Sequence, residues 1–145
     1  DYVYKLKEDF PNDEIIINGG ITSVDQIKPH LQKIDGVMIG RAAYHTPYLL
    51  ADIEREIFNN EDIPSRQDVI EQLIPYVKDE LKKGTRLNQI MRHTLGLFHG
   101  QSGASHWKRY LSENMCVRDA DVKKIDHIMD KIKYNNVDMR EGQSA

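Results

Sequence analysis

The sequence has few of the features that mark secreted or membrane proteins. It contains one cysteine, Cys116, which excludes an internal disulfide framework and fits a reducing compartment. No apolar run approaches the roughly 20 residues of a membrane span, and the opening DYVYKLKEDF lacks the apolar core of a signal peptide. We therefore expect a cytoplasmic protein with no membrane partner.

The patterns of metal centres and of cysteine nucleophiles are also missing. None of the six histidines forms a helical i, i+4 pair with carboxylate support, so we expect no metal site. Cys116 has no neighbouring base in the sequence, and we interpret it as a structural residue. A net charge of −3 with 39% hydrophobic residues is typical of a globular protein and by itself indicates no nucleic acid.

Two apolar triplets predict the strands of a parallel sheet. Ile15–Ile17 follows the polar turn PNDE, and Val37–Ile39 follows KIDG. Because each triplet is apolar at successive positions, we expect both faces of each strand to be buried. A helix capped by Thr22 or Ser23 is expected between them, running to about Gln32. The order is that of βα units from a barrel or an open sheet.

A second amphipathic helix is expected at Tyr48–Asn59, with Tyr44 and His45 either approaching a ligand or beginning this helix, which we favour. Two parallel strands cannot satisfy their outer edges alone. We therefore expect more strands from upstream sequence or from a second copy. Because the chain begins with Asp1 in a helical pattern, we interpret it as a fragment or processed product.

From Ser65 onward the sequence has helical periodicity. We expect an α/β region over residues 1–62, a bundle of four helices over 63–135, and a disordered tail over 136–145. Pro75 should kink the first of these helices, which ends at Gly84, and we interpret Trp107 as a core residue. The expected helix starts are Ser65 (in a capping box with Asp68), Thr85, Ala104 and Asp121.

Both expected strands end in glycine. Asn18, Gly19 and Gly20 follow the first strand, and Gly40 and Arg41 follow the second. Free amides at a helix start attract an anion, glycines let it approach, and Arg41 adds a fork of donors. Loops after the last two strands of a βα barrel often form a phosphate site. Glycines after strands are also ordinary turns, and the pair of turns favours phosphate without naming the ligand.

Residues 85–112 contain no aspartate or glutamate, although 23 acidic residues in 145 predict about four in such a window. The formal charge of this stretch is +4. Because the whole chain has a net charge of −3, the remaining residues have a formal charge of −7. A local positive surface of this kind is typical of nucleic-acid binding. The basic and histidine residues of the stretch are Arg86, Arg92, Lys108, Arg109, His93, His99 and His106.

Helical geometry groups these polar side chains. In the helix expected after Thr85, Arg86, Gln89 and His93 lie on one face, opposite the apolar residues. In the next helix Lys108 and Arg109 share a face opposite the apolar residues. Two interpretations stay open for this surface: RNA or another polyanion binds there, or it is an ordinary solvated exterior.

Two segments resemble a known family. NGGI and DGVMIGRAAYHTPYLL look like the last two βα units of the flavin-dependent tRNA-dihydrouridine synthases. MRHTLGLFHGQSGASHWKRYLSEN resembles the helical-domain signature of the A-type members. The resemblance covers about residues 15–115, and implies the C-terminal part of an FMN-containing (β/α)8 TIM barrel followed by a helical tRNA-binding domain.

The resemblance also implies an activity. Such enzymes reduce uridines in the tRNA D-loop with hydride passed from NADPH through FMN, while a cysteine on an earlier barrel loop protonates the base. That cysteine lies outside this chain, so we expect the chain alone to be inactive. By position, the resemblance assigns binding of the FMN phosphate to Asn18, Gly19, Gly20, Gly40 and Arg41. It assigns RNA binding to Arg92, Lys108, Arg109, Arg86 and His106.

The sequence departs from the family pattern at two positions, and two other functions stay open. Ser105 and Lys108 stand where the family usually has arginine, which weakens bidentate phosphate binding. One alternative is a different phosphate-binding barrel enzyme, acting on a sugar phosphate without RNA. The other is a non-catalytic module whose helical bundle binds RNA or protein.

Overall fold

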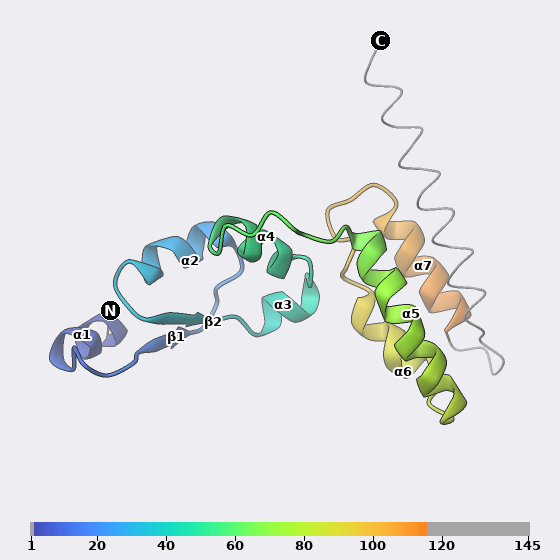
Figure 1. Ribbon diagram of the computed structural model, residues 1–145, viewed down its shortest axis with the longest axis horizontal. Helices are drawn as coiled ribbons and strands as arrows, with labels where there is room; N and C mark the ends of the chain where they lie inside the picture. Colours follow the sequence, from blue (N-terminus) through green and yellow to red (C-terminus); the bar gives the residue numbers. More distant parts are fainter. Residues whose placement is uncertain (1, 116–145) are drawn as a thin grey trace, which may run out of the picture. The chain divides into compact units, whose positions relative to one another are not determined.

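The structure, a computed structural model, describes residues 2–115. The chain divides into two compact units, Asp1–Ile63 and Pro64–Ala145 (Figure 1). Cys116, the helix expected to begin at Asp121 and the tail 136–145 lie outside the described residues. In the described part of the chain no helix is long and apolar enough to cross a bilayer.

The first unit contains two parallel strands. Ile17 lies opposite Val37 in their register, as the two apolar triplets predict. β1 begins one residue later than its triplet and β2 one residue earlier. Asp35, just before β2, links the two strand starts, since its Oδ2 accepts from the Ile15 amide at 2.8 Å. The elements are α1 (Tyr2–Asp9), β1 (Ile16–Asn18), α2 (Val24–Leu31), β2 (Gly36–Met38), α3 (Arg41–His45) and α4 (Leu49–Glu56).

One face of this small sheet is packed and the other is open. Ile17 joins a core cluster with Ile27 of α2, and Ile53 of α4 packs against it. On the opposite face Ile16 is 55% exposed and Met38 is 49% exposed. The prediction that both faces are buried is therefore wrong for the described residues, because the unit's helices cover only the face to which Ile17 points.

The segment after β2 forms two helices where one was expected. α3 ends at His45, and Thr46 leaves helical geometry with φ −136° and ψ 71°. Pro47 explains the break, since a proline disfavours helical geometry in the residue before it. Tyr44 and His45 therefore belong to α3 and do not begin the next helix, which corrects the sequence-based interpretation.

The second unit begins with the predicted capping box. Ser65 Oγ accepts from the Asp68 amide at 3.1 Å, and Asp68 Oδ2 accepts from the Ser65 amide at 2.9 Å. The helix that follows runs without interruption through Pro75, and Gly84 lies just beyond it with φ +90°. The elements are α5 (Arg66–Lys82), α6 (Leu87–Met91), the 3-10 helix η1 (Arg92–Thr94) and α7 (Ala104–Asn114).

The helix expected to start at Thr85 is shorter than predicted. Thr85 does not cap it, because its hydroxyl donates to Glu80 Oε2 at 2.9 Å and Arg86 occupies the N-cap position. α6 gives way to a 3-10 turn after Met91. In the turns that follow, the Trp107 indole Nε1 donates to the Thr94 carbonyl at 2.9 Å, an oxygen that also accepts from the Leu97 amide at 3.0 Å.

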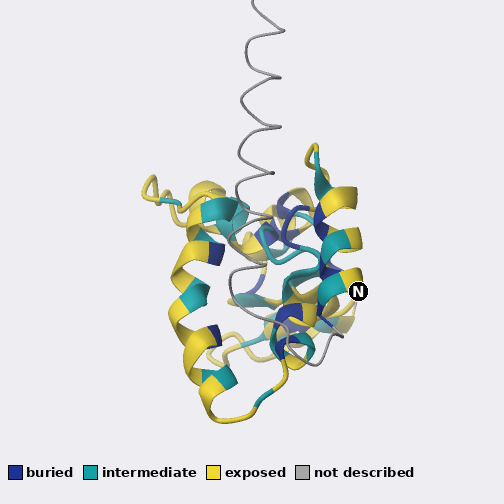
Figure 2. Ribbon diagram, turned by 90° about the vertical axis from the view of Figure 1, so that its right-hand side faces the viewer, coloured by how far each residue is buried: buried dark blue, intermediate teal, exposed yellow. Residues whose placement is uncertain are grey.

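Trp107 lies at the centre of the second unit, as predicted. It is 0% exposed, and its ring centroid lies 5.1 Å from that of Phe98. Ile70 of α5 and Leu111 of α7 are also fully buried. Figure 2 shows such buried residues in dark blue beneath helices whose outer sides are exposed. Burial also raises the pKa of the Tyr110 phenol above its ordinary value.

Candidate functional site

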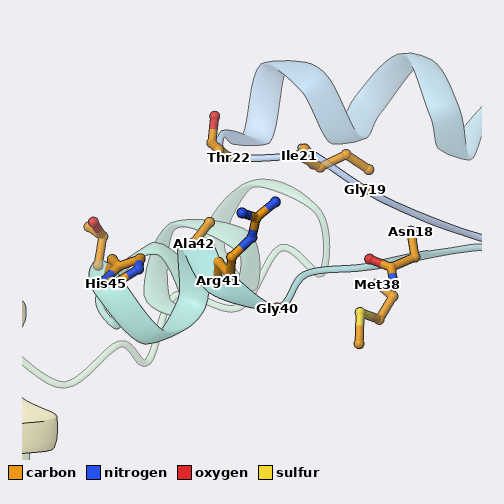
Figure 3. Close-up of a pocket in the computed structure, with 11 residues that line it drawn as sticks. Asn18, Gly19, Ile21, Thr22, Met38, Gly40, Arg41, Ala42 and His45 are labelled. Atoms are coloured by element: carbon orange, nitrogen blue, oxygen red, sulfur yellow. The ribbon is translucent and has the colours of Figure 1, made fainter.

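The first unit has a cavity of about 700 Å³ at the carboxyl ends of its two strands. Parallel strands end at the same edge of a sheet, so the loops that follow them meet there (Figure 3). All five residues predicted to bind a phosphate line this cavity. The lining residues are Asn18, Gly19, Gly20, Ile21, Thr22, Met38, Gly40, Arg41, Ala42, His45 and Thr46.

The glycine turn after β1 needs glycine for its backbone conformation. Gly19 has φ +130° and Gly20 has φ +69°, values that side chains rarely tolerate. A Cβ at either position would have no atom within 4 Å, so crowding inside the chain does not explain them. The turn therefore has an unusual backbone and open space beside it, as a cradle for a ligand requires.

Hydrogen-bond donors without acceptors in the described residues surround the cavity. Within residues 2–115 the amides of Gly19, Gly20, Gly40 and Arg41 have no acceptor. No described carboxylate pairs with the exposed Arg41 guanidinium, which extends from the start of α3 toward the Gly19–Thr22 segment (Figure 3). None of the lining residues carries a carboxylate. Backbone amides and a guanidinium without counter-charge attract an anion.

Three polar lining residues were not among the predicted site residues: Thr22, His45 and Thr46. His45 follows Arg41 by four residues, so both lie on one side of α3, a spacing that could have identified it. His45 stands at the end of α3 away from Asn18, with its ring 5.6 Å from that of Tyr44 (Figure 3). The structure thus extends the predicted site along α3.

The second unit exposes every residue predicted to bind RNA. Arg86, Arg92, His106, Lys108 and Arg109 are all exposed. Lys108 and Arg109 share one side of α7, where Lys108 also accepts a bond through its carbonyl from the Ser112 hydroxyl. The surface formed by these residues and the other exposed side chains of 85–112 is called the acid-free surface below.

The shorter α6 changes one predicted grouping. Arg86 and Gln89 stay together, since Gln89 Oε1 accepts from the Arg86 amide at 3.2 Å. His93 instead belongs to η1, where Arg92 Nε donates to its Nε2 at 3.2 Å. The predicted group is thus divided between α6 and η1, because the α-helix ends at Met91 and the 3-10 helix follows it directly.

Two bonds hold the turns between α6 and α7. Trp107 Nε1 binds the Thr94 carbonyl, and Arg66 Nε of α5 donates to the Leu97 carbonyl at 2.9 Å. Gly100 and Gly103 have positive φ values, which tight turns require. In the part of the chain that the structure describes, no three histidine, cysteine or acidic side chains lie together as a metal site.

The chain is similar to known proteins over nearly its whole length. Residues 1–133 match the family described as dihydrouridine synthase (Dus). Three relatives, each named tRNA-dihydrouridine(20/20a) synthase, come from Synechocystis, Vibrio cholerae and Escherichia coli K12. Their identities are 46% over 136 residues, 43% over 135 and 48% over 128.

These matches cover 93%, 92% and 88% of this chain, but only 41%, 41% and 37% of the respective relatives. The chain therefore spans about two-fifths of the length of the curated relatives it matches. A family match over 133 of 145 residues agrees with the motifs at both strand ends and in the helical unit. This chain belongs to the dihydrouridine synthase family.

Proposed function

We propose that this chain supplies the FMN phosphate cradle and the tRNA-binding surface of a tRNA-dihydrouridine synthase. The observation that carries the proposal is the cavity at the ends of β1 and β2, where four unpaired amides meet the Arg41 guanidinium within the described residues. A phosphate monoester with two negative charges suits such a donor set. The family match favours FMN among phosphate-bearing ligands.

Each residue has a part in this cradle. Gly19 and Gly20 would donate backbone amides to phosphate oxygens, and their lack of side chains lets the oxygens approach. Gly40 would donate from the second turn, and Arg41 would neutralise charge with a fork of N–H groups. The Asn18 side-chain amide, at the end of β1, would bind a polar group of the ligand beyond the phosphate.

The open sheet face supports a barrel in the whole protein. Ile16 and Met38 present apolar surface on the face that this chain leaves uncovered. Further strands of a (β/α)8 barrel, from a longer chain or from a second copy, would bury that face and pair the free edges. In such a barrel the cavity would open at the carboxyl ends of the strands, where barrel enzymes place their sites.

When bound, FMN would supply hydride transfer between NADPH and a uridine of the tRNA D-loop. This chain's part would be to hold the phosphate end and to bind the RNA, in the cytoplasm where tRNA is modified. A base inside a folded RNA must leave its stack to meet a cofactor in a cavity. The protonating cysteine predicted by the resemblance is not among these residues, so we expect the chain alone to be inactive.

The acid-free surface would bind the tRNA backbone. Arg92, Lys108 and Arg109 would pair with phosphates, with Arg86 and His106 at hand for further contacts. All are exposed, and residues 85–112 hold no carboxylate to compete with RNA phosphates. The names of the three relatives, which specify tRNA, favour this polyanion over others.

The phosphate cradle is tested by comparing FMN with riboflavin, which lacks the phosphate. We expect the chain to prefer FMN, and Arg41→Ala to weaken FMN binding at least about tenfold because a charge-assisted bond is removed. Flavin fluorescence titration measures both. Arg55→Ala is the matched control, since Arg55 lies on α4, outside the cavity, and pairs with Asp52. Equal binding of FMN and riboflavin would contradict the proposal.

The rival assignment is a barrel enzyme for a sugar phosphate that uses no RNA. The cavity alone fits any phosphate monoester, so only the acid-free surface and the family match separate the two. Titration with tRNA decides between them. Binding that weakens steeply as salt rises supports a tRNA enzyme, and absence of tRNA binding would favour the sugar-phosphate enzyme.

A further inference from the structure

One side chain outside the cavity holds the glycine turn in place. The Thr22 amide donates to Gln26 Oε1 at 2.7 Å, and the Thr22 hydroxyl donates to the same oxygen at 3.2 Å. Gln26 lies in the first turn of α2, three residues after the N-cap residue Ser23. The Ser23 side chain makes no cap, so Gln26 is the side chain that orders the entry to this helix.

The bond is placed where it can control the cradle. Ile21 is only 7% exposed and packs in the core of the first unit, and Thr22 follows it. The turn is thus fixed at its far end by a buried side chain and by Gln26. Gly19 and Gly20 have no side chains to hold them, so the directions of their amides depend on how firmly the residues after them are held.

Gln26 itself does not line the cavity, whereas Thr22 does. Because the Gln26 oxygen accepts a hydrogen bond from the Thr22 amide, this amide is not available to a ligand. The two glycine amides, left without acceptors in the described residues, are then the donors that this turn offers.

We propose that Gln26 is a positioning residue for the phosphate cradle. Its side-chain oxygen holds Thr22 and so fixes the Gly19–Gly20 turn with both amides ready for a phosphate. This role rests on the proposed function of the cavity. Affinity gains from such preorganisation, because a loose turn must lose conformational freedom when the ligand binds.

Two substitutions separate the acceptor oxygen from the rest of the side chain. Gln26→Met keeps a similar length but removes the acceptor. Gln26→Glu keeps an acceptor oxygen in reach of Thr22, but its charge lies within a Debye length of the cradle and repels a phosphate, so it tests the bond to Thr22 through hydrogen exchange. Gln32→Met, at the other end of α2, is the matched control for the methionine substitution.

The experiment uses the ¹⁵N-labelled 145-residue chain, titrated with FMN and with riboflavin at constant salt. We expect Gln26→Met to raise the Kd for FMN about fivefold, the equivalent of one neutral hydrogen bond, and to leave that for riboflavin unchanged. Hydrogen exchange of the Thr22 amide should quicken. Gln26→Glu should keep the exchange rate of the Thr22 amide within about twofold of that of the original chain.

The outcomes distinguish this inference from the proposed function. If the original chain prefers FMN and Gln26→Met binds it equally well, the positioning role is overturned while the cradle stands. If the original chain binds FMN and riboflavin alike, the cradle itself is overturned. A loss of affinity in Gln26→Met without faster exchange of the Thr22 amide, or one that Gln32→Met reproduces, indicates general destabilisation and also overturns the role.

Discussion

The two units present hydrogen-bond donors and cationic groups in different ways. In the first unit the donors are backbone amides on the positive-φ residues Gly19 and Gly20, together with Arg41, around one cavity. In the second unit they are exposed side chains such as Lys108 and Arg109, spread over a surface without acidic residues. Fixed amides suit one small anion of defined shape, whereas mobile cationic side chains suit a long polyanion and depend strongly on salt.

The largest expected effect is the unfolding of the second unit alone, which distinguishes its binding activity from that of the first unit. Trp107→Ala removes a fully buried side chain, its packing against Phe98 and its bond to Thr94. We expect it to destabilise the second unit by about 3–5 kcal/mol and to abolish tRNA binding. Denaturant titration followed by circular dichroism measures the stability, and a gel shift measures tRNA binding.

The same variant checks whether the cradle is independent. Because every described residue that lines the cavity belongs to the first unit, the preference for FMN over riboflavin should survive Trp107→Ala. Trp107→Phe is the control, since it keeps a ring against Phe98 but loses the indole donor, and it should cost less stability. Loss of the FMN preference in Trp107→Ala would show that the two binding activities are not separable.

The next effect acts on the cradle alone. Gly20→Val places a β-branched side chain at φ +69°, which costs about 1–3 kcal/mol and forces the turn to change. We expect FMN affinity to fall about tenfold or more while tRNA affinity stays the same. Gly20→Asn is the matched control, because asparagine tolerates left-handed geometry better and should retain more of the affinity. Equal losses of FMN affinity in both variants would mean that the site requires the absence of a side chain at this position and does not depend on the backbone angle.

The smallest effect concerns the slope of a salt dependence. Lys108→Ala with Arg109→Ala should weaken tRNA binding and lower the slope of log K against log salt by about one for each phosphate that is no longer neutralised. FMN binding should not change. The control replaces Lys82 and Lys83, which pair with Asp79 and Glu80 on and next to α5, outside residues 85–112. An unchanged slope in the α7 variant would contradict the acid-free surface as the tRNA site.

Local signals predicted much of the fold. The Ser65 and Asp68 pair marked the start of α5, and the two apolar triplets marked parallel strands to within one residue. Such features depend on neighbours a few residues apart, so the sequence contains them. The end of α6 was not predictable in this way, because the apolar periodicity continues past Met91 to Leu95 and Phe98 while the structure changes to 3-10 geometry.

The same distinction between local and long-range features applies to the candidate site. The glycine turns and Arg41 were identifiable because each follows a strand, and parallel strands bring the loops that follow them to one edge. For His45 the less favoured of two interpretations, an approach to a ligand, agrees with its place on α3 beside the cavity, because Pro47 separates α3 from the next helix. Gln26 was missed because it follows Thr22 by four residues and not by the three of the capping box of Ser65 and Asp68.

The sequence by itself determined the kinds of groups that this protein can offer: glycines at the strand ends, one guanidinium after β2, and a stretch of 28 residues without negative charge. Only the tertiary structure decided which of them meet. Parallel pairing of β1 with β2 brought two distant turns to one cavity, and the bond from Trp107 to Thr94 joined α7 to the turn after α6. Chemical identity is local to a residue, whereas proximity between distant residues depends on how the whole chain packs.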